Sequence, residues 1–280
     1  MTRWLKVILT GLVFLITIEI TMEARCHDTS PPFTNATSIE SDSLELILSH
    51  FKEPGQPIPR WLCIDFFEVG GYEEFYFEAR ATFSREFNGL HLLAFEMSCS
   101  AGGSCSVERV YTVNDQHEVL ATMDIGKDSG NATIDRTTKN KFILDNLIEL
   151  RLTETKYAFN KESGTEEFVS RKLNFEYYLI EKSGQFTKVK NVRQNTRKYP
   201  ESAYRVLSLE ELNLLPKVDL DIMRNEIFAS YGYRFKTDKW QQYFDKQEWY
   251  QAQFDDVTDR LSIIEKVNVS RILEVSRVKR

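Results

Sequence analysis

Histidine is scarce in this sequence. Its 280 residues include only His27, His50, His91 and His117, and none lies in residues 200–280. Because histidine is the side chain that exchanges protons most readily near neutral pH, we do not expect a conventional His-based active site in the C-terminal part. The sequence also lacks a P-loop, a dinucleotide-binding fingerprint, and the GxSxG and HExxH motifs. We therefore expect a protein that is not an enzyme, with no cofactor and no metal site.

Basic residues are outnumbered by acidic ones. The chain has 36 lysines and arginines against 42 aspartates and glutamates, a formal net charge of −6. Nonspecific binding to nucleic acid needs a cationic surface, so we expect no nucleic-acid partner. A hydrophobic fraction of 42% is nevertheless enough for packed cores, and most of the chain should fold.

The N-terminus has the pattern of an export signal. Arg3 and Lys6 precede an uninterrupted run of twelve apolar or weakly polar residues, Val7 to Ile18. A membrane-spanning helix needs about 20 such residues. We therefore expect residues 1–25 to be a signal peptide, or in second place an uncleaved membrane anchor. The remainder would be extracytoplasmic: secreted, periplasmic, or anchored and facing outward.

Four cysteines allow two disulfides in an oxidising compartment. Cys99 and Cys105 flank Ser-Ala-Gly-Gly-Ser, whose glycines permit a sharp reversal, so we predict a bridge between them. Cys26 and Cys63 would form the second pair. Alternatively, Cys26 is a lipidation site, although the preceding Arg25 is not the small residue usual there. Membrane contact is expected only through the N-terminal segment or this lipid.

After residue 25 the sequence changes from a spacer to a series of strands. Residues 26–60 combine a polar spacer with a short helix over 42–51, where apolar residues recur at helical spacing. Residues 61–190 contain short β-prone runs about ten residues apart, which favours an antiparallel meander, sandwich or small barrel. The predicted strands are 72–83, 90–97, 106–113, 118–125, 146–159 and 168–180, with a loop at 126–131.

A basic segment separates these strands from the C-terminal part. Residues 182–198 hold six basic residues and no acidic one. The simpler interpretation is a solvated linker, placed at residues 191–201. The alternative is a cationic strip that touches anionic wall polymer or lipid headgroups.

Residues 202–278 have the pattern of a small all-α domain, which makes the fold class α+β. Ser208 and Glu211 form a capping box for one helix. A second helix should end at Gly232, and later helices could be capped by Thr237 and Thr258. Ten of the protein's 35 aromatic residues lie between 228 and 254.

This C-terminal pattern resembles the YARHG domain of bacterial exported proteins. Phe228-Ala229-Ser230-Tyr231-Gly232 matches the motif Tyr-Ala-Arg-His-Gly at its aromatic, alanine and glycine positions, and departs from it at Ser230 and Tyr231. Further similar positions are Arg224, Asn225, Glu226, Trp240, Tyr243, Phe244, Trp249 and Tyr250. The resemblance implies an extracytoplasmic module that is often attached to other exported domains, including peptidases.

The candidate residues of this module have two interpretations each. Arg224, Asn225 and Glu226 would form a structural hydrogen-bond network or, less simply, a polar site. The aromatic side chains would form a core or stack on sugar rings or peptide. The leading hypothesis is a non-catalytic exported or envelope-associated protein, whose partner would be cell-envelope glycan, peptide or protein. The alternatives are an accessory or degenerate hydrolase, with carboxylates and His91 or His117 in the β-rich domain, and a structural lipoprotein.

Overall fold

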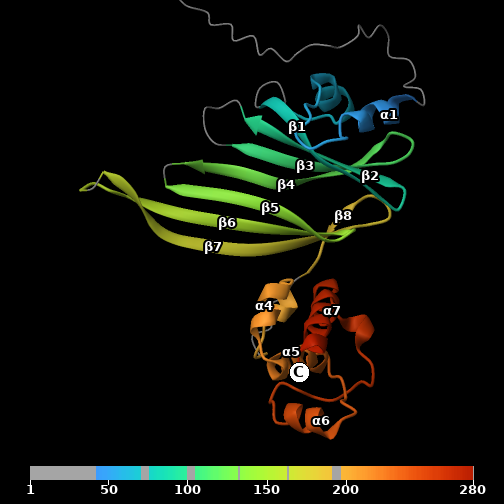
Figure 1. The fold of residues 1–280 in the computed structure, drawn as a ribbon, viewed down its shortest axis with the longest axis vertical. Helices are drawn as coiled ribbons and strands as arrows, with labels where there is room; N and C mark the ends of the chain where they lie inside the picture. Colours follow the sequence, from blue (N-terminus) through green and yellow to red (C-terminus); the bar gives the residue numbers. More distant parts are fainter. Residues whose placement is uncertain are drawn as a thin grey trace, which may run out of the picture.

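The fold is α+β: an antiparallel sheet of eight strands is followed by a group of short helices (Figure 1). The computed structural model describes residues 42–70, 76–99, 105–131, 133–162, 164–190 and 197–279. The predicted signal segment and Cys26 therefore lie outside the described residues. No helix among the described residues has both the length and the apolar character needed to cross a bilayer.

The strands follow one another in sequence order, and each pairs with the next in antiparallel fashion. The strands are β1 (Tyr76–Phe87), β2 (Leu90–Cys99), β3 (Ser106–Val113), β4 (Val119–Asn131), β5 (Ile134–Leu144), β6 (Leu147–Asn160), β7 (Thr165–Ile180) and β8 (Phe186–Lys188). The predicted meander is confirmed.

Two details of the strand prediction were wrong. The expected loop at 126–131 is the second half of β4, and β5 was missed. These two segments pair with each other, from Lys127 with Thr138 to Asn131 with Ile134. Glycines 126 and 130 and the polar run 135–141 suggest a loop locally, but pairing with neighbouring strands decides their conformation.

The sheet folds over so that one face, here called the inner face, packs against itself. Leu92 of β2 and Val110 of β3 belong to the same buried cluster as Ile148 and Leu150 of β6. At one end the fold is tied by the β7–β8 turn, where the carbonyl of Gly184 accepts a hydrogen bond of 2.8 Å from the Thr112 hydroxyl. Side chains alternate along a strand, so residues between these lie on the opposite, outer face.

The outer face of β1–β3 is covered by the N-terminal helices. These are α1 (Asp42–Ser49), where a helix was predicted, and η1 (Leu62–Phe66), a π-helical turn. Phe67 lies at the centre of this contact, with its ring centroid 5.1 Å from that of Phe95 and 4.3 Å from that of Tyr111. Residues 55–58 also pair with the backbone of β1, which covers that edge of the sheet.

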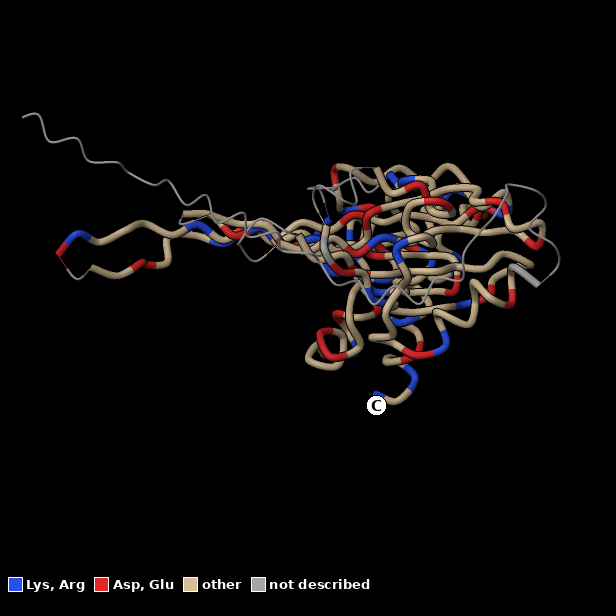
Figure 2. Tube along the Cα trace, turned by 90° about the horizontal axis from the view of Figure 1, so that it is seen from above, with Lys and Arg blue, Asp and Glu red and all other residues tan. Residues whose placement is uncertain are grey.

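The ends of β6 and β7 form a two-stranded arm that projects from the sheet (Figure 2). Among the described residues, β6 pairs with β5 as far as Lys156, the N–H of Tyr157 donates to the carbonyl of Thr133, and the remainder of β6 pairs with β7. Phe159 and Phe168 on the arm are 61% and 62% exposed. The arm therefore carries large apolar side chains that the rest of the described chain leaves uncovered.

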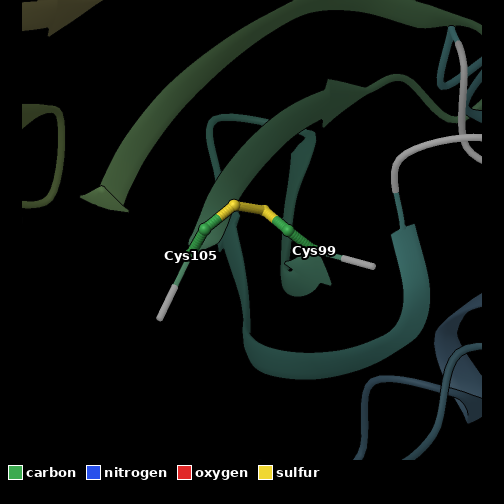
Figure 3. Close-up of a disulfide and its surroundings, with 2 residues drawn as sticks. All are labelled: Cys99 and Cys105. Atoms are coloured by element: carbon green, nitrogen blue, oxygen red, sulfur yellow. A yellow bond between two sulfur atoms is a disulfide. The ribbon is translucent and has the colours of Figure 1, made fainter. Parts of the chain in front are cut away.

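The predicted disulfide joins the facing ends of β2 and β3 (Figure 3). The Cα atoms of Cys99 and Cys105 are 5.4 Å apart, within the range that a disulfide spans. Cys63 is fully buried in the cluster beneath α1. Its predicted pairing with Cys26 lies outside the described residues.

The C-terminal helices form a compact unit, called here the helical module (residues 197–279). They are α3 (Glu201–Tyr204), α4 (Leu209–Leu214), α5 (Lys217–Ala229), α6 (Asp238–Phe244), η2 (Thr258–Arg260) and α7 (Ile263–Val278). In Figure 1 the module lies on the side of the sheet opposite to α1.

Three residues were predicted to cap helices of this module, and the structure confirms one of them. The Ser208–Glu211 capping box of α4 is confirmed. Thr237 precedes α6, but its side chain forms no capping hydrogen bond. Thr258 was wrong as the cap of the last helix, because a second capping box between Ser262 and Glu265 starts α7 four residues later.

Candidate functional site

The aromatic side chains of the helical module pack around Phe244. This residue is fully buried, and its ring stacks on Phe235 at a centroid distance of 4.9 Å. The rings of Tyr243, Trp249 and Tyr250 lie 4.9, 6.0 and 5.7 Å from it. The cluster is completed by Phe228, Tyr233 and Trp240. Packing thus accounts for these positions, while stacking on sugar rings or peptide stays a prediction.

Gly232 has the backbone conformation predicted for it. Its φ of +78° lies in the left-handed region, which residues other than glycine rarely adopt. A Cβ atom here would lie 2.9 Å from the carbonyl oxygen of Gln251. The carbonyl of Gly232 also accepts hydrogen bonds from the backbone of Gln253 and Phe254. The glycine therefore ends α5 and lets the loop after α6 approach closely.

The Arg224-Asn225-Glu226 segment holds backbone in place. Glu226 is 3% exposed, and its carboxylate accepts hydrogen bonds of 2.8 and 3.0 Å from the backbone N–H groups of Lys198 and Tyr199. Burial raises its pKa above the usual value, against the effect of these two donors. The guanidinium of Arg224 donates to the side-chain oxygen of its neighbour Asn225. Glu226 therefore fixes the chain that enters the module.

A buried ion pair, which sequence reasoning missed, lies beside this segment. The Arg197 guanidinium is 2.7 Å from a carboxylate oxygen of Glu265, and both side chains are at most 1% exposed. Glu265 also accepts a hydrogen bond of 2.7 Å from the Tyr231 hydroxyl, and Arg197 contacts the Ser230 hydroxyl. Burial, and then the Glu265 carboxylate, raise the pKa of Tyr231. Ser230 and Tyr231, the two departures from the motif, are thus both partners of this pair.

The burial of Arg197 corrects the prediction of a solvated basic linker at its C-terminal end. A side chain that was expected in solvent is an internal ion of the module. The neighbouring Lys198 remains 53% exposed and pairs with Asp219 at 2.9 Å. Residues 191–196 of the predicted linker lie outside the described residues.

The module joins the sheet through a small apolar contact with a polar centre. Leu147 and Tyr177 on the outer face pack against Val206, Ile264 and Val267 of the module. The Tyr177 hydroxyl donates to the Glu149 carboxylate at 2.8 Å and accepts from the backbone N–H of Val206 at 2.7 Å. Burial, and secondarily the Glu149 charge, raise the pKa of Tyr177. One neutral phenol therefore connects both parts of the chain.

A cavity of about 500 Å³ lies beside this contact, between sheet and module. Its apolar lining comes from Ile143, Leu173, Phe175 and Val206. Its charged lining consists of Lys141, Arg151, Glu149, Arg205, Glu211 and Arg271. Sequence reasoning had no signal for it, because these residues are spread over 130 positions and meet only through the fold.

Histidine and acidic side chains were the candidates for catalysis, and together with cysteine they are the usual metal ligands. In the described part of the chain no three histidine, cysteine, aspartate or glutamate side chains gather as metal ligands would. Of the hydrolase candidates, His91 lies 3.4 Å from Asp115, where the β3–β4 turn meets the start of β2. His117 adopts a positive φ of 66° in that turn.

Comparison with known proteins identifies one part of the chain. The YARHG domain matches residues 196–277, which coincide with the helical module. No curated protein and no solved structure matches the chain. A YARHG domain and a disulfide are both features of extracytoplasmic proteins. The chain therefore carries, after its β-rich domain, a C-terminal YARHG domain.

Proposed function

We propose that the protein is a non-catalytic exported protein that binds envelope material outside the cytoplasm. The observation that supports the absence of catalysis is that the polar side chains of the YARHG domain bind other groups of the domain. Glu226 binds backbone, Glu265 binds Arg197, and Tyr231 binds Glu265. Side chains held in this way support a rigid unit and are not placed to react with a substrate. The aromatic cluster has the same role, because its rings contact one another.

We further propose that the YARHG domain supports the sheet mechanically. The module covers the outer face of β5–β7, as α1 and η1 cover that of β1–β3. A sheet that is supported in this way can present its arm and its cavity in a fixed geometry. The partner would be glycan, peptide or protein of the cell envelope.

The test of this proposal is retention of the purified protein on cell-wall glycan, peptide and lipid fractions. Retention on one fraction and no turnover in a broad hydrolase panel are expected. Failure to bind every fraction would remove the binding element. Recovery of the native protein in the cytosol, with its N-terminal segment intact, would remove the exported location.

One observation favours a second candidate, an accessory or degenerate hydrolase. His91 and Asp115 lie within 3.4 Å, as a base and the carboxylate that orients it would. Hydrolase activity that His91→Gln abolishes would establish this candidate. A structural lipoprotein, the third alternative, would be established by mass spectrometry that finds a diacylated Cys26.

A further inference from the structure

The cavity between sheet and YARHG domain carries an excess of positive charge. Its lining has four basic side chains, Lys141, Arg151, Arg205 and Arg271, against the carboxylates of Glu149 and Glu211, which leaves a net charge of +2. The chain as a whole has a net charge of −6. Positive charge in this hollow is therefore opposite in sign to the protein and attracts anions locally.

Three of the four cations form no ion pair among the described residues. Arg205 forms a two-pronged ion pair with Glu211, with N–O distances of 2.9 and 2.7 Å. The other three are Lys141, Arg151 and Arg271. After hydrogen bonds to its own backbone N–H and to Ser208, the charges of Lys141 and Arg271 contribute to lowering the pKa of the exposed Glu210 carboxylate nearby. Glu149, the other carboxylate of the cavity, is 6% exposed and accepts from Tyr177. Arg151 and Lys141, and the part of the Arg271 guanidinium that does not bond backbone, therefore keep donors for a ligand.

Arg151 and Arg271 both contact other residues of the fold, and Arg271 is the more firmly held. The Arg151 guanidinium lies 5.5 Å from the ring centroid of Phe175, its partner across the β6–β7 ladder. One Arg271 nitrogen donates to the carbonyl of Leu207 at 2.7 Å, which orients the rest of its guanidinium. They come from the sheet and from α7, so their separation depends on how the module is docked. Arginine forks are suited to phosphate oxygens.

We propose that this cavity binds a phosphate ester. A phosphate monoester carries about −1.5 to −2 charges near neutral pH, which balances the net charge of the lining. A volume of about 500 Å³ lies within the range of small-ligand sites, so more than the phosphate group fits. Leu173, which is 53% exposed, and Phe175 provide an apolar wall for the organic part of the ester. The ester group comes from a small molecule or polymer, or from a lipid headgroup.

The test is calorimetric titration of the full chain with glycerol phosphate, and with acetate as a carboxylate of lower charge. We expect saturable binding of glycerol phosphate, weaker at high salt, and little binding of acetate. The double variant Arg151→Gln/Arg271→Gln should weaken the affinity at least about tenfold, because each lost arginine removes charge-assisted hydrogen bonds. The matched control is Lys52→Gln/Lys246→Gln, which removes two exposed charges outside the cavity and should bind as the unmodified protein does.

The double variant could fold poorly, because Arg271 donates a hydrogen bond to backbone. The single variant Arg151→Gln changes only an exposed side chain, so a loss of affinity in it reports on binding and not on folding. Sedimentation with vesicles that contain phosphatidic acid, a lipid phosphate monoester, against phosphatidylcholine vesicles, distinguishes the sources. Loss of vesicle binding in the arginine variants would support the site with a lipid as its source. Absence of saturable binding to glycerol phosphate and to phosphatidic acid, or equal losses in both double variants, would overturn the proposed site. Since these titrations use no wall material, their failure is separate from failure of the proposed function.

Discussion

The sheet is covered by helices twice on its outer face, and the two contacts differ in chemistry. Beneath α1 and η1, the buried cluster consists of apolar side chains with Phe67 at its centre. Beneath the YARHG domain, the buried contact is smaller and includes the Tyr177 hydroxyl, the Glu149 carboxylate and a neighbouring cavity. A complete apolar contact excludes water and ligands, whereas an incomplete one with polar groups leaves room for them.

The difference indicates separate roles for the two covers. The first completes the hydrophobic core of the β-rich domain and stabilises it in proportion to the apolar area buried. The second attaches a unit with its own core and its own buried ion pair. A site at the second contact can therefore change without unfolding the sheet. The following substitutions test that separation.

The largest effect is expected from Phe67→Ala. Removal of this buried ring leaves a cavity among Phe51, Phe95 and Tyr111, and should cost about 4 kcal/mol of unfolding free energy. Urea unfolding measures the loss, and amide hydrogen exchange should place it in β1–β3. The control Phe168→Ala alters a side chain that is 62% exposed and should cost under about 0.5 kcal/mol. Equal losses of protection in α5 and α7 would contradict separate cores.

The next effect concerns the YARHG domain itself. Arg197→Ala leaves the Glu265 carboxylate buried without its cation, and a loss of about 3 kcal/mol is expected. Hydrogen exchange should rise in α5 and α7 while the sheet keeps its protection. Lys198→Ala removes the exposed pair with Asp219 and should cost at most about 1 kcal/mol. If both variants lost the same stability, the buried pair would have no special role.

A smaller loss is expected at the contact between the two parts. Tyr177→Phe removes the hydroxyl that links Glu149 to the backbone of Val206, at a cost of about 2 kcal/mol. The adjacent Tyr178→Phe provides the control, because the Tyr178 hydroxyl is only partly buried and bonds Glu176 on the same strand. Thermal unfolding followed separately in each part should show weaker coupling only for Tyr177→Phe. Identical melting curves for the two variants would be evidence against this link.

The smallest effect depends on pH. The Arg205 guanidinium, against the opposing effect of burial, lowers the pKa of Glu211 to about 2. Because the pKa of an unfolded glutamate is about 4.3, the pair stabilises the fold above that value and is lost as pH falls towards 2. The carboxylate is half exposed, so the contribution is about 0.5–1 kcal/mol.

Glu211→Gln should therefore reduce the slope of stability against pH between about 4.3 and 2. Glu274→Gln, at an exposed position of α7, serves as the control. Denaturant midpoints measured across this range give the slope for each variant. An unchanged slope in Glu211→Gln would show that Arg205 does not hold this carboxylate in solution.

Local signals in the sequence predicted the elements that depend on local interactions. The turn at Gly232 and the capping box at Ser208 involve residues within four positions of each other, and both were predicted. The motif Ser262-Ile-Ile-Glu265 carries the same signal, but the nearby Thr258 was preferred as a cap. Strand β5 is polar on most of its length and gave no alternation, so only its neighbours reveal it.

The residues of the ion pair and the cavity could not be predicted from local sequence signals. Glu265 lies 68 residues after Arg197, and no sequence pattern indicates that the two meet inside a core. Arg151 and Arg271 are brought to one cavity by the docking of a helix on a sheet. The aromatic-rich segment was recognisable from composition alone, since its rings are close in sequence as well as in space.

The order of the strands has a consequence for how this protein is made. Since every strand of the meander pairs with the one before it, the backbone pairing of the sheet joins neighbouring segments of the chain, which favours faster folding than pairing between distant segments. A chain delivered end-first, from a ribosome or through a translocon, can therefore add each strand to a growing edge as it emerges. The helices that close the assembly arrive last, when the surface that receives them is already complete.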